Sequence, residues 1–152
     1  MGPTLARILG TFFGTGQSKI MPGTCGAAAA TALIVLVPDP YYPYVVGGLA
    51  LVATLIGPWC AEVLIADTGR KDPQNFVLDE AAGVWIAAFR LSRPEPISFV
   101  IAFLLFRILD ITKPGPIRWM ERLPGGKGVV YDDVVAGLIA LGLGLLIETQ
   151  FL

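Results

Sequence analysis

Five apolar stretches divide the chain, and each predicts a helix buried in protein or lipid. They cover residues 26–37, 44–66, 76–89, 97–111 and 134–152. A helix that crosses a bilayer needs about 20 apolar residues, so the second stretch is long enough and the last nearly so. The other three are short. The pattern therefore predicts an all-α fold, a small polytopic membrane helical bundle with some short or re-entrant helices.

The polar segments between the first stretches indicate their orientation. Residues 37–44, VPDPYYPY, are a Pro-rich turn with three tyrosines and no basic residue, which is typical of the non-cytoplasmic interface. Arg7 and Lys19 precede the first stretch, and Arg70 and Lys71 follow the second. Because basic residues favour the inner side, both of those ends are predicted to lie in the cytoplasm.

The third and fourth stretches leave two arrangements open. They form either a spanning hairpin that turns at RLSRPEP, or two helices that enter the membrane without crossing it. The hairpin leaves Arg90 and Arg93 outside, which the distribution of basic residues disfavours. Under both arrangements, six acidic residues fall at cytoplasmic ends of apolar segments: Asp72, Asp79, Glu80, Asp110, Asp132 and Asp133.

Composition supports a membrane protein with one domain, residues 1–152. Of the 152 residues, 55% are hydrophobic and 15% charged, whereas a soluble domain carries about 25% charged residues. The net charge of −1 indicates no nucleic-acid partner. The chain has no histidine, which excludes Ser-His-Asp chemistry. Cys25 and Cys60 form no Cys-x-x-Cys motif, and we interpret both as small buried side chains.

The acidic motifs carry the candidate chemistry. Several carboxylates without histidine or thiolate are the ligand set of a hard cation, and Mg²⁺ fits best because it leaves positions for phosphate and water. Lysine and arginine beside such a cation indicate phosphoryl chemistry, since they neutralise charge on the transferred group. Asp79 and Glu80 are the strongest pair, because they interrupt an apolar run where solvation cannot explain them.

Other acidic residues also have structural interpretations. Asp132 and Asp133 can cap the last helix and complement its dipole, and Asp72 can cap a helix that starts at Pro73. In FRILDITKPGPIRW, an acid sits between two bases at spacings of three residues, which fits either an ion-pair ladder or a metal ligand between phosphate binders. Glu62 is a second-tier candidate for an intramembrane acid.

Two Gly-rich segments, GTFFGTGQSKIMPGTCG and LPGGKGV, fail the patterns of nucleotide-binding loops. Their backbone amides can still line an anion site. A transporter that uses Glu62, Asp79 and Asp110 is the alternative function. It predicts charges spread through the depth of the membrane, whereas the sequence concentrates them at one face.

Four blocks taken together resemble the phosphatidylglycerophosphatase A family. They are PGTCG at 22–26, KDPQNFVLDEAAG at 71–83, FRILDITKPGPIRW at 106–119 and LPGGKGVVYDDVVAG at 123–137, in the order of the family. The resemblance implies an enzyme of the bacterial inner membrane whose active site faces the cytoplasm. Its partners are the membrane and a phospholipid, phosphatidylglycerophosphate, which it hydrolyses with Mg²⁺ to phosphatidylglycerol and phosphate. The oligomeric state stays open.

The resemblance also assigns roles to individual residues. Catalysis and metal binding fall to a subset of Asp79, Glu80, Asp110, Asp132 and Asp133, and the nucleophile is either water or one of these aspartates. Arg107 and Lys113 bind phosphate oxygens, with Lys127 as a third candidate. Ala27 stands where many family members carry Ser, which leaves Thr24 as the nearby hydroxyl and the fourth candidate for binding the phosphate.

Overall fold

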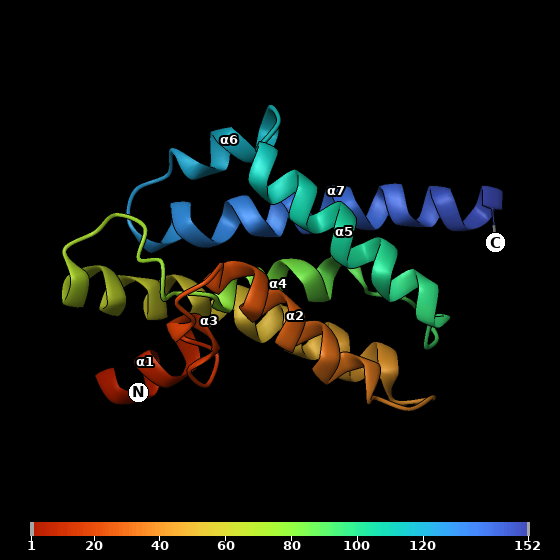
Figure 1. Ribbon diagram of the computed structural model, residues 1–152, viewed down its shortest axis with the longest axis horizontal. Helices are drawn as coiled ribbons and strands as arrows, with labels where there is room; N and C mark the ends of the chain where they lie inside the picture. Colours follow the sequence, from red (N-terminus) through yellow and green to blue (C-terminus); the bar gives the residue numbers. More distant parts are fainter. Residues whose placement is uncertain (1, 152) are drawn as a thin grey trace.

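The computed structural model describes residues 2–151, and all regular secondary structure in that range is helical (Figure 1). This confirms the predicted all-α fold. The elements are α1 (Pro3–Gly10), the short 3₁₀ helix η1 (Thr15–Gln17), α2 (Pro22–Val35), α3 (Tyr42–Thr68), α4 (Leu78–Ala87), α5 (Pro96–Thr112), α6 (Pro116–Glu121) and α7 (Gly126–Phe151). The five apolar stretches correspond to α2, α3, α4, α5 and α7, whereas no stretch predicted α1 or α6.

The ends of the helices follow from proline and glycine. A proline stands in the first turn of α1, α2, α3, α5 and α6, where its missing N–H is not needed. Gly69 ends α3 at φ 66°, a left-handed conformation that glycine adopts without steric cost. By length and composition, α3 and α7 could each cross a membrane, with 27 and 26 residues.

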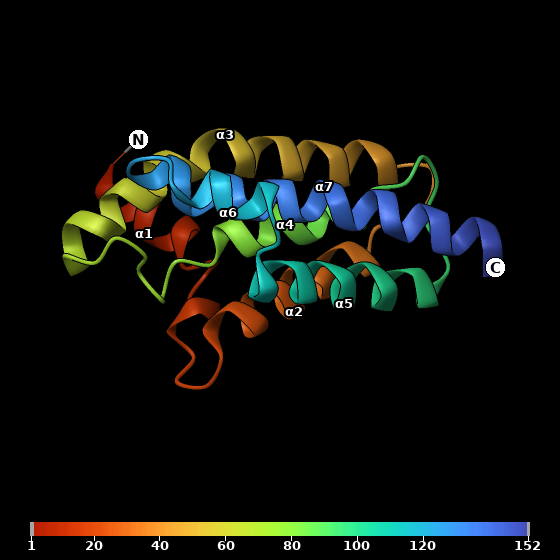
Figure 2. The ribbon, with the colours of Figure 1, turned by 90° about the horizontal axis from the view of Figure 1, so that it is seen from above.

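The short helix α4 lies at the centre of the bundle, packed against α2, α3, α5 and α7 (Figures 1 and 2). Eight of its ten residues are buried, and the indole N–H of Trp85 donates to the carbonyl of Ala30 at 3.0 Å. At 1.5 Å per residue α4 is about 15 Å long, too short to cross a bilayer. Residues 69–77 bring the chain without a helix from the end of α3 to the start of α4, so α4 begins inside the molecule.

The chain turns from α4 to α5 at the end that holds the C-terminus. There the loop before α5 meets the loop before α3 (Figure 2). The backbone N–H of Arg93 donates to Asp39 Oδ1 at 2.7 Å, and Arg90 Nη2 lies 2.7 Å from Glu148 Oε1 of α7. Helices α4 and α5 are therefore joined by a turn at this end, and their crossing of a membrane stays a prediction. Glu148 neutralises the charge of Arg90.

Two glycines allow α4 and α7 to cross closely. A Cβ added to Gly137 would overlap the backbone carbonyl of Gly83, which cannot rotate aside as a side chain can. A Cβ on Gly83 would in turn meet the ring of Phe106 and the carbonyl of Asp133. This crossing sets the distance between the acidic motifs of the two helices.

We expect Gly137→Ala to lower the midpoint of thermal unfolding in detergent, because forcing a methyl group into a packed contact costs about 1–3 kcal/mol. The matched control is Gly142→Ala on the same helix, where an added Cβ meets nothing within 4 Å. Circular dichroism at 222 nm measures both midpoints. Equal midpoints for the two variants would contradict the close crossing.

Candidate active site

A cavity of about 590 Å³ opens where residues 69–77 meet the helices α2, α4, α5 and α7. Its walls contain all five predicted carboxylates and three of the four predicted phosphate binders: Asp79, Glu80, Asp110, Asp132, Asp133, Thr24, Arg107 and Lys113. Lys127 is not among the lining residues and is exposed in the first turn of α7. The fold thus brings three separate acidic motifs to one place.

The helix boundaries show that the capping interpretations are wrong. Because α7 begins at Gly126, Asp132 and Asp133 lie inside the helix and are only 3% exposed each. Asp72 is not a cap either, since α4 begins at Leu78 and Asp72 lies in the segment before it, on the cavity wall. Helix capping therefore does not explain Asp72, Asp132 or Asp133.

Asp79, Glu80 and Asp133 form the tightest acidic group of the cavity. One oxygen from each residue lies within 4.8 Å of the others. Asp79 Oδ1 accepts from the backbone N–H of Glu80 at 2.9 Å, but Glu80 Oε2 is buried without a hydrogen-bond partner among residues 2–151. Three buried carboxylates at such distances repel one another, and an unpartnered buried oxygen is costly. A bound cation would relieve both costs, so the group fits a metal site.

Arg107 is fixed by two neighbours on the cavity wall. Its Nη1 donates to Asp110 Oδ2 one helical turn later, and its Nη2 donates to Thr24 Oγ1 of α2 at 3.2 Å. Arg107 Nε is buried and has no partner in the described chain. The guanidinium is therefore held at the cavity by α2 and α5 together.

Lys113 departs from the predicted ion-pair ladder. It ends α5 with φ 44° and reaches across to α7, where Nζ donates to Asp132 Oδ2 at 2.7 Å and to Glu121 Oε1 of α6 at 3.0 Å. Burial alone lowers the pKa of Lys113, but the contacts with Asp132 and Glu121 outweigh it and raise the pKa above its ordinary value. Lys113 therefore stays protonated at neutral pH. Only the Arg107–Asp110 half of the ladder forms.

Three charged residues of the cavity wall were not predicted to belong to it, and the second-tier candidate Glu62 lies elsewhere. Lys19, Lys71 and Glu121 also line the cavity. Lys19 and Lys71 were used only to predict which helix ends lie in the cytoplasm, and no local sequence pattern indicated Glu121. Glu62 lies outside the cavity walls, where its Oε1 accepts the backbone N–H of Gly126 at 2.7 Å. Glu62 thus caps α7, which is a structural role.

The model of the phosphatidylglycerophosphatase A family matches residues 8–148, which include every predicted site residue. The chain belongs to the phosphatidylglycerophosphatase A family. It is 37% identical over 141 residues to phosphatidylglycerophosphatase A of Escherichia coli (strain K12), covering 90% of this chain and 80% of the relative. The corresponding protein of Haemophilus influenzae is 33% identical over 136 residues, covering 89% of this chain and 83% of the relative.

A third relative carries a different name. A Bacteroides thetaiotaomicron protein named "Putative phosphatidylinositol-3-phosphatase" is 39% identical over 140 residues, covering 88% of this chain and 87% of the relative. No solved structure shows a significant match to the chain. Membership in the phosphatidylglycerophosphatase A family confirms the predicted lipid phosphatase, an enzyme of phospholipid metabolism, in place of the transporter. Two helices long and apolar enough to cross a membrane agree with a lipid substrate.

Proposed function

We propose that this chain hydrolyses the phosphomonoester of phosphatidylglycerophosphate with Mg²⁺ bound by Asp79, Glu80 and Asp133. The observation that carries the proposal is the buried carboxylate group with its unpartnered Glu80 oxygen, in a cavity that also contains Arg107 and Lys113. Oxygen ligands alone suit Mg²⁺, and the absence of histidine from the chain leaves no nitrogen ligand that would favour zinc.

The protein side chains would position the phosphate. When bound, Mg²⁺ supplies a Lewis acid that neutralises charge on the phosphoryl oxygens. Arg107 and Lys113 would bind the remaining oxygens, and Asp110 and Asp132 would orient these two cations rather than bind the metal. The bond between phosphorus and the glycerol oxygen breaks, whether water or an aspartate attacks first.

The Thr24 hydroxyl would help to keep Arg107 in place, since it accepts from Nη2. Lys127 has no part in this arrangement because it lies away from the cavity walls. We treat residues 1–152 as one domain, since the central helix α4 packs against helices from both halves of the sequence.

The active site would face the cytoplasm of a bacterial cell from its inner membrane. Arg7, Lys19, Arg70 and Lys71 all belong to α1 and the loops at the end where α3 finishes. Basic residues concentrate on the cytoplasmic side of membrane proteins. The lipid phosphate at that surface would then reach the cavity without crossing the bilayer.

Phosphate release tests the proposed function. We expect purified protein in detergent to release phosphate from phosphatidylglycerophosphate with Mg²⁺ and to lose this activity in excess EDTA. Mg²⁺ should also raise the thermal unfolding midpoint of the wild type but not of an Asp79→Asn variant, because binding to the folded state stabilises it. Phosphatidylinositol 3-phosphate is the comparison substrate, chosen from the name of the Bacteroides relative. Activity that survives EDTA would contradict the metal site, and faster release from the inositol lipid would contradict the substrate.

A further inference from the structure

A second cavity, of about 380 Å³, adjoins the first. The two share Lys19, Pro22, Pro73 and Gln74 as lining residues, so they are neighbours. The second cavity extends towards the loop around η1 and the residues that follow α3, away from the acidic group. The two cavities therefore present adjacent surfaces to a bound molecule.

The walls of the second cavity carry positive charge and hydrogen-bond donors. Lys19 and Arg70 line it together with Gln17, Ser18 and Asn75, and no carboxylate does. Within residues 2–151 neither Lys19 nor Arg70 forms an ion pair, whereas Arg107 and Lys113 are both paired with carboxylates. The second cavity therefore presents uncompensated cations, which suit an anion.

Close packing holds the loop around η1 against the segment that precedes α4. Gly16 lies against the backbone carbonyl of Asn75, so that a Cβ on Gly16 would overlap it, and the backbone N–H of Val77 donates to the carbonyl of Gly10 at 2.8 Å. Ser18 Oγ donates to the carbonyl of Ile20 at 2.9 Å. The loop that carries Lys19 is thus fixed against the segment that leads to Asp79 and Glu80.

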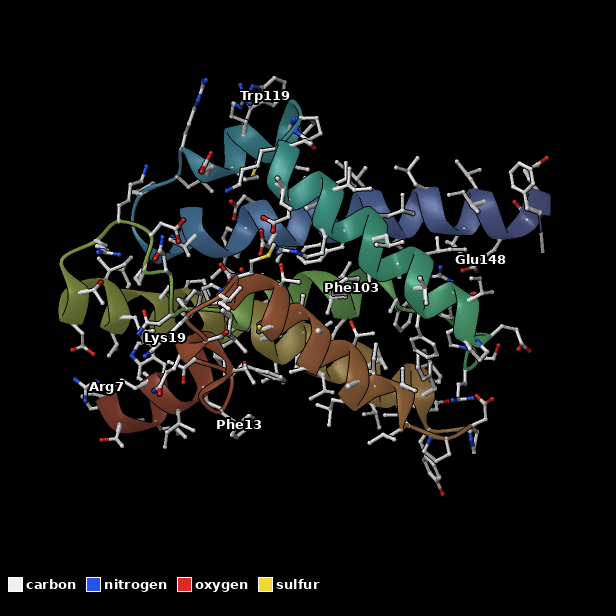
Figure 3. All side chains as sticks on the ribbon, viewed as in Figure 1. Arg7, Phe13, Lys19, Phe103, Trp119 and Glu148 are labelled. Atoms are coloured by element: carbon white, nitrogen blue, oxygen red, sulfur yellow. The ribbon has the colours of Figure 1, made fainter. Side chains whose placement is uncertain are left out.

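Apolar side chains border the same loop. Phe13, Ile20 and Met21 are 71%, 77% and 61% exposed. Figure 3 shows Phe13 and Lys19 on the part of the molecule that contains α1, far from Glu148 at the other end. Exposed apolar groups beside cations are typical of a segment at the membrane surface, where lipid phosphates lie.

The proposed substrate contains two phosphates joined by one glycerol: a terminal monoester and a diester linked to diacylglycerol. Resting on the proposed function, we propose that Lys19 and Arg70 form a subsite for the phosphodiester, next to the carboxylate group that acts on the monoester. The subsite selects lipids with both phosphates over phosphatidate, which has only the monoester. Its place beside Ile20 and Met21 leaves the acyl chains facing the membrane.

The test compares kcat/KM on phosphatidylglycerophosphate and on phosphatidate with the same acyl chains, in mixed micelles with Mg²⁺. For the full-length variant Arg70→Gln, whose side chain lines only the second cavity, we expect kcat/KM on phosphatidylglycerophosphate to fall roughly 10- to 100-fold, the effect of losing a hydrogen bond to a charged group. Activity on phosphatidate should change less than about twofold. This unchanged activity also shows that the variant is folded.

The matched control is Arg118→Gln/Arg122→Gln, which removes two exposed basic residues of the α6 region that line neither cavity. It should leave the preference between the two lipids unchanged. Equal loss on both lipids in the Arg70→Gln variant would overturn the subsite and indicate general attraction to anionic micelles. No loss on either lipid would overturn it as well. A wild type that hydrolyses neither lipid would overturn the proposed function, and the subsite with it.

Discussion

Asp133→Asn is expected to reduce phosphate release by roughly 10³-fold while the protein still folds, since it removes one of the proposed metal ligands and with it several kcal/mol of transition-state stabilisation. Asp133 is 3% exposed, and its carboxylate belongs to the tight group with Asp79 and Glu80. Asparagine has almost the same shape, so the packing at the α4–α7 crossing is kept. It also removes one of three repelling charges, so the unfolding midpoint in EDTA should stay equal or rise.

The control is Asp67→Asn. Asp67 is an acidic residue at the surface, 37% exposed, which pairs with Arg7 outside both cavities. The Asp67→Asn variant should keep nearly full activity, since exposed ion pairs contribute little to stability. Turnover numbers and midpoints with and without Mg²⁺ are measured for the wild type and both variants. If Asp133→Asn kept more than about a tenth of the wild-type activity, its role in metal binding would be wrong.

Lys113→Met is expected to reduce both activity and stability. Methionine keeps the length of the side chain but leaves Asp132, whose side chain is 4% exposed, without its cation. An unpaired buried carboxylate costs about 3 kcal/mol, at the lower end of the usual range because Lys113 is itself 24% exposed. The variant also removes the proposed contact between Lys113 and the phosphate, which should reduce turnover roughly 10²- to 10³-fold.

A double variant separates the two effects. Lys113→Met/Asp132→Asn removes the stranded charge, so we expect the unfolding midpoint to recover most of its loss while turnover remains low. Glu121→Gln is the control, because Glu121 is the more exposed partner of Lys113, at 46%, and its loss leaves the Asp132 contact in place. If the double variant regained wild-type turnover, Lys113 would act only by neutralising Asp132.

Charges inside apolar stretches were the informative signal of the sequence. Asp79 and Glu80 could be selected because an acid within an apolar run has no ordinary structural explanation. Arg107 and Asp110 could be paired from their spacing alone, and the structure contains that contact. The sequence misplaced the start of the last helix, which begins at Gly126 rather than residue 134. Asp132 and Asp133 therefore lie within the helix and do not cap it.

By itself, the sequence determined the helical class, the apolar stretches and the acidic motifs. Hydrophobic periodicity and the cost of burying a charge both depend on residues that are neighbours along the chain. Only the tertiary structure decided which groups meet. Lys113 pairs with Glu121 and Asp132, which lie 8 and 19 residues further along the chain. It can reach them because its own left-handed backbone turns the chain away from α5. The close α4–α7 crossing, the acidic group and the second cavity depend on packing between segments far apart in sequence, where spacing along the chain no longer sets distance in space.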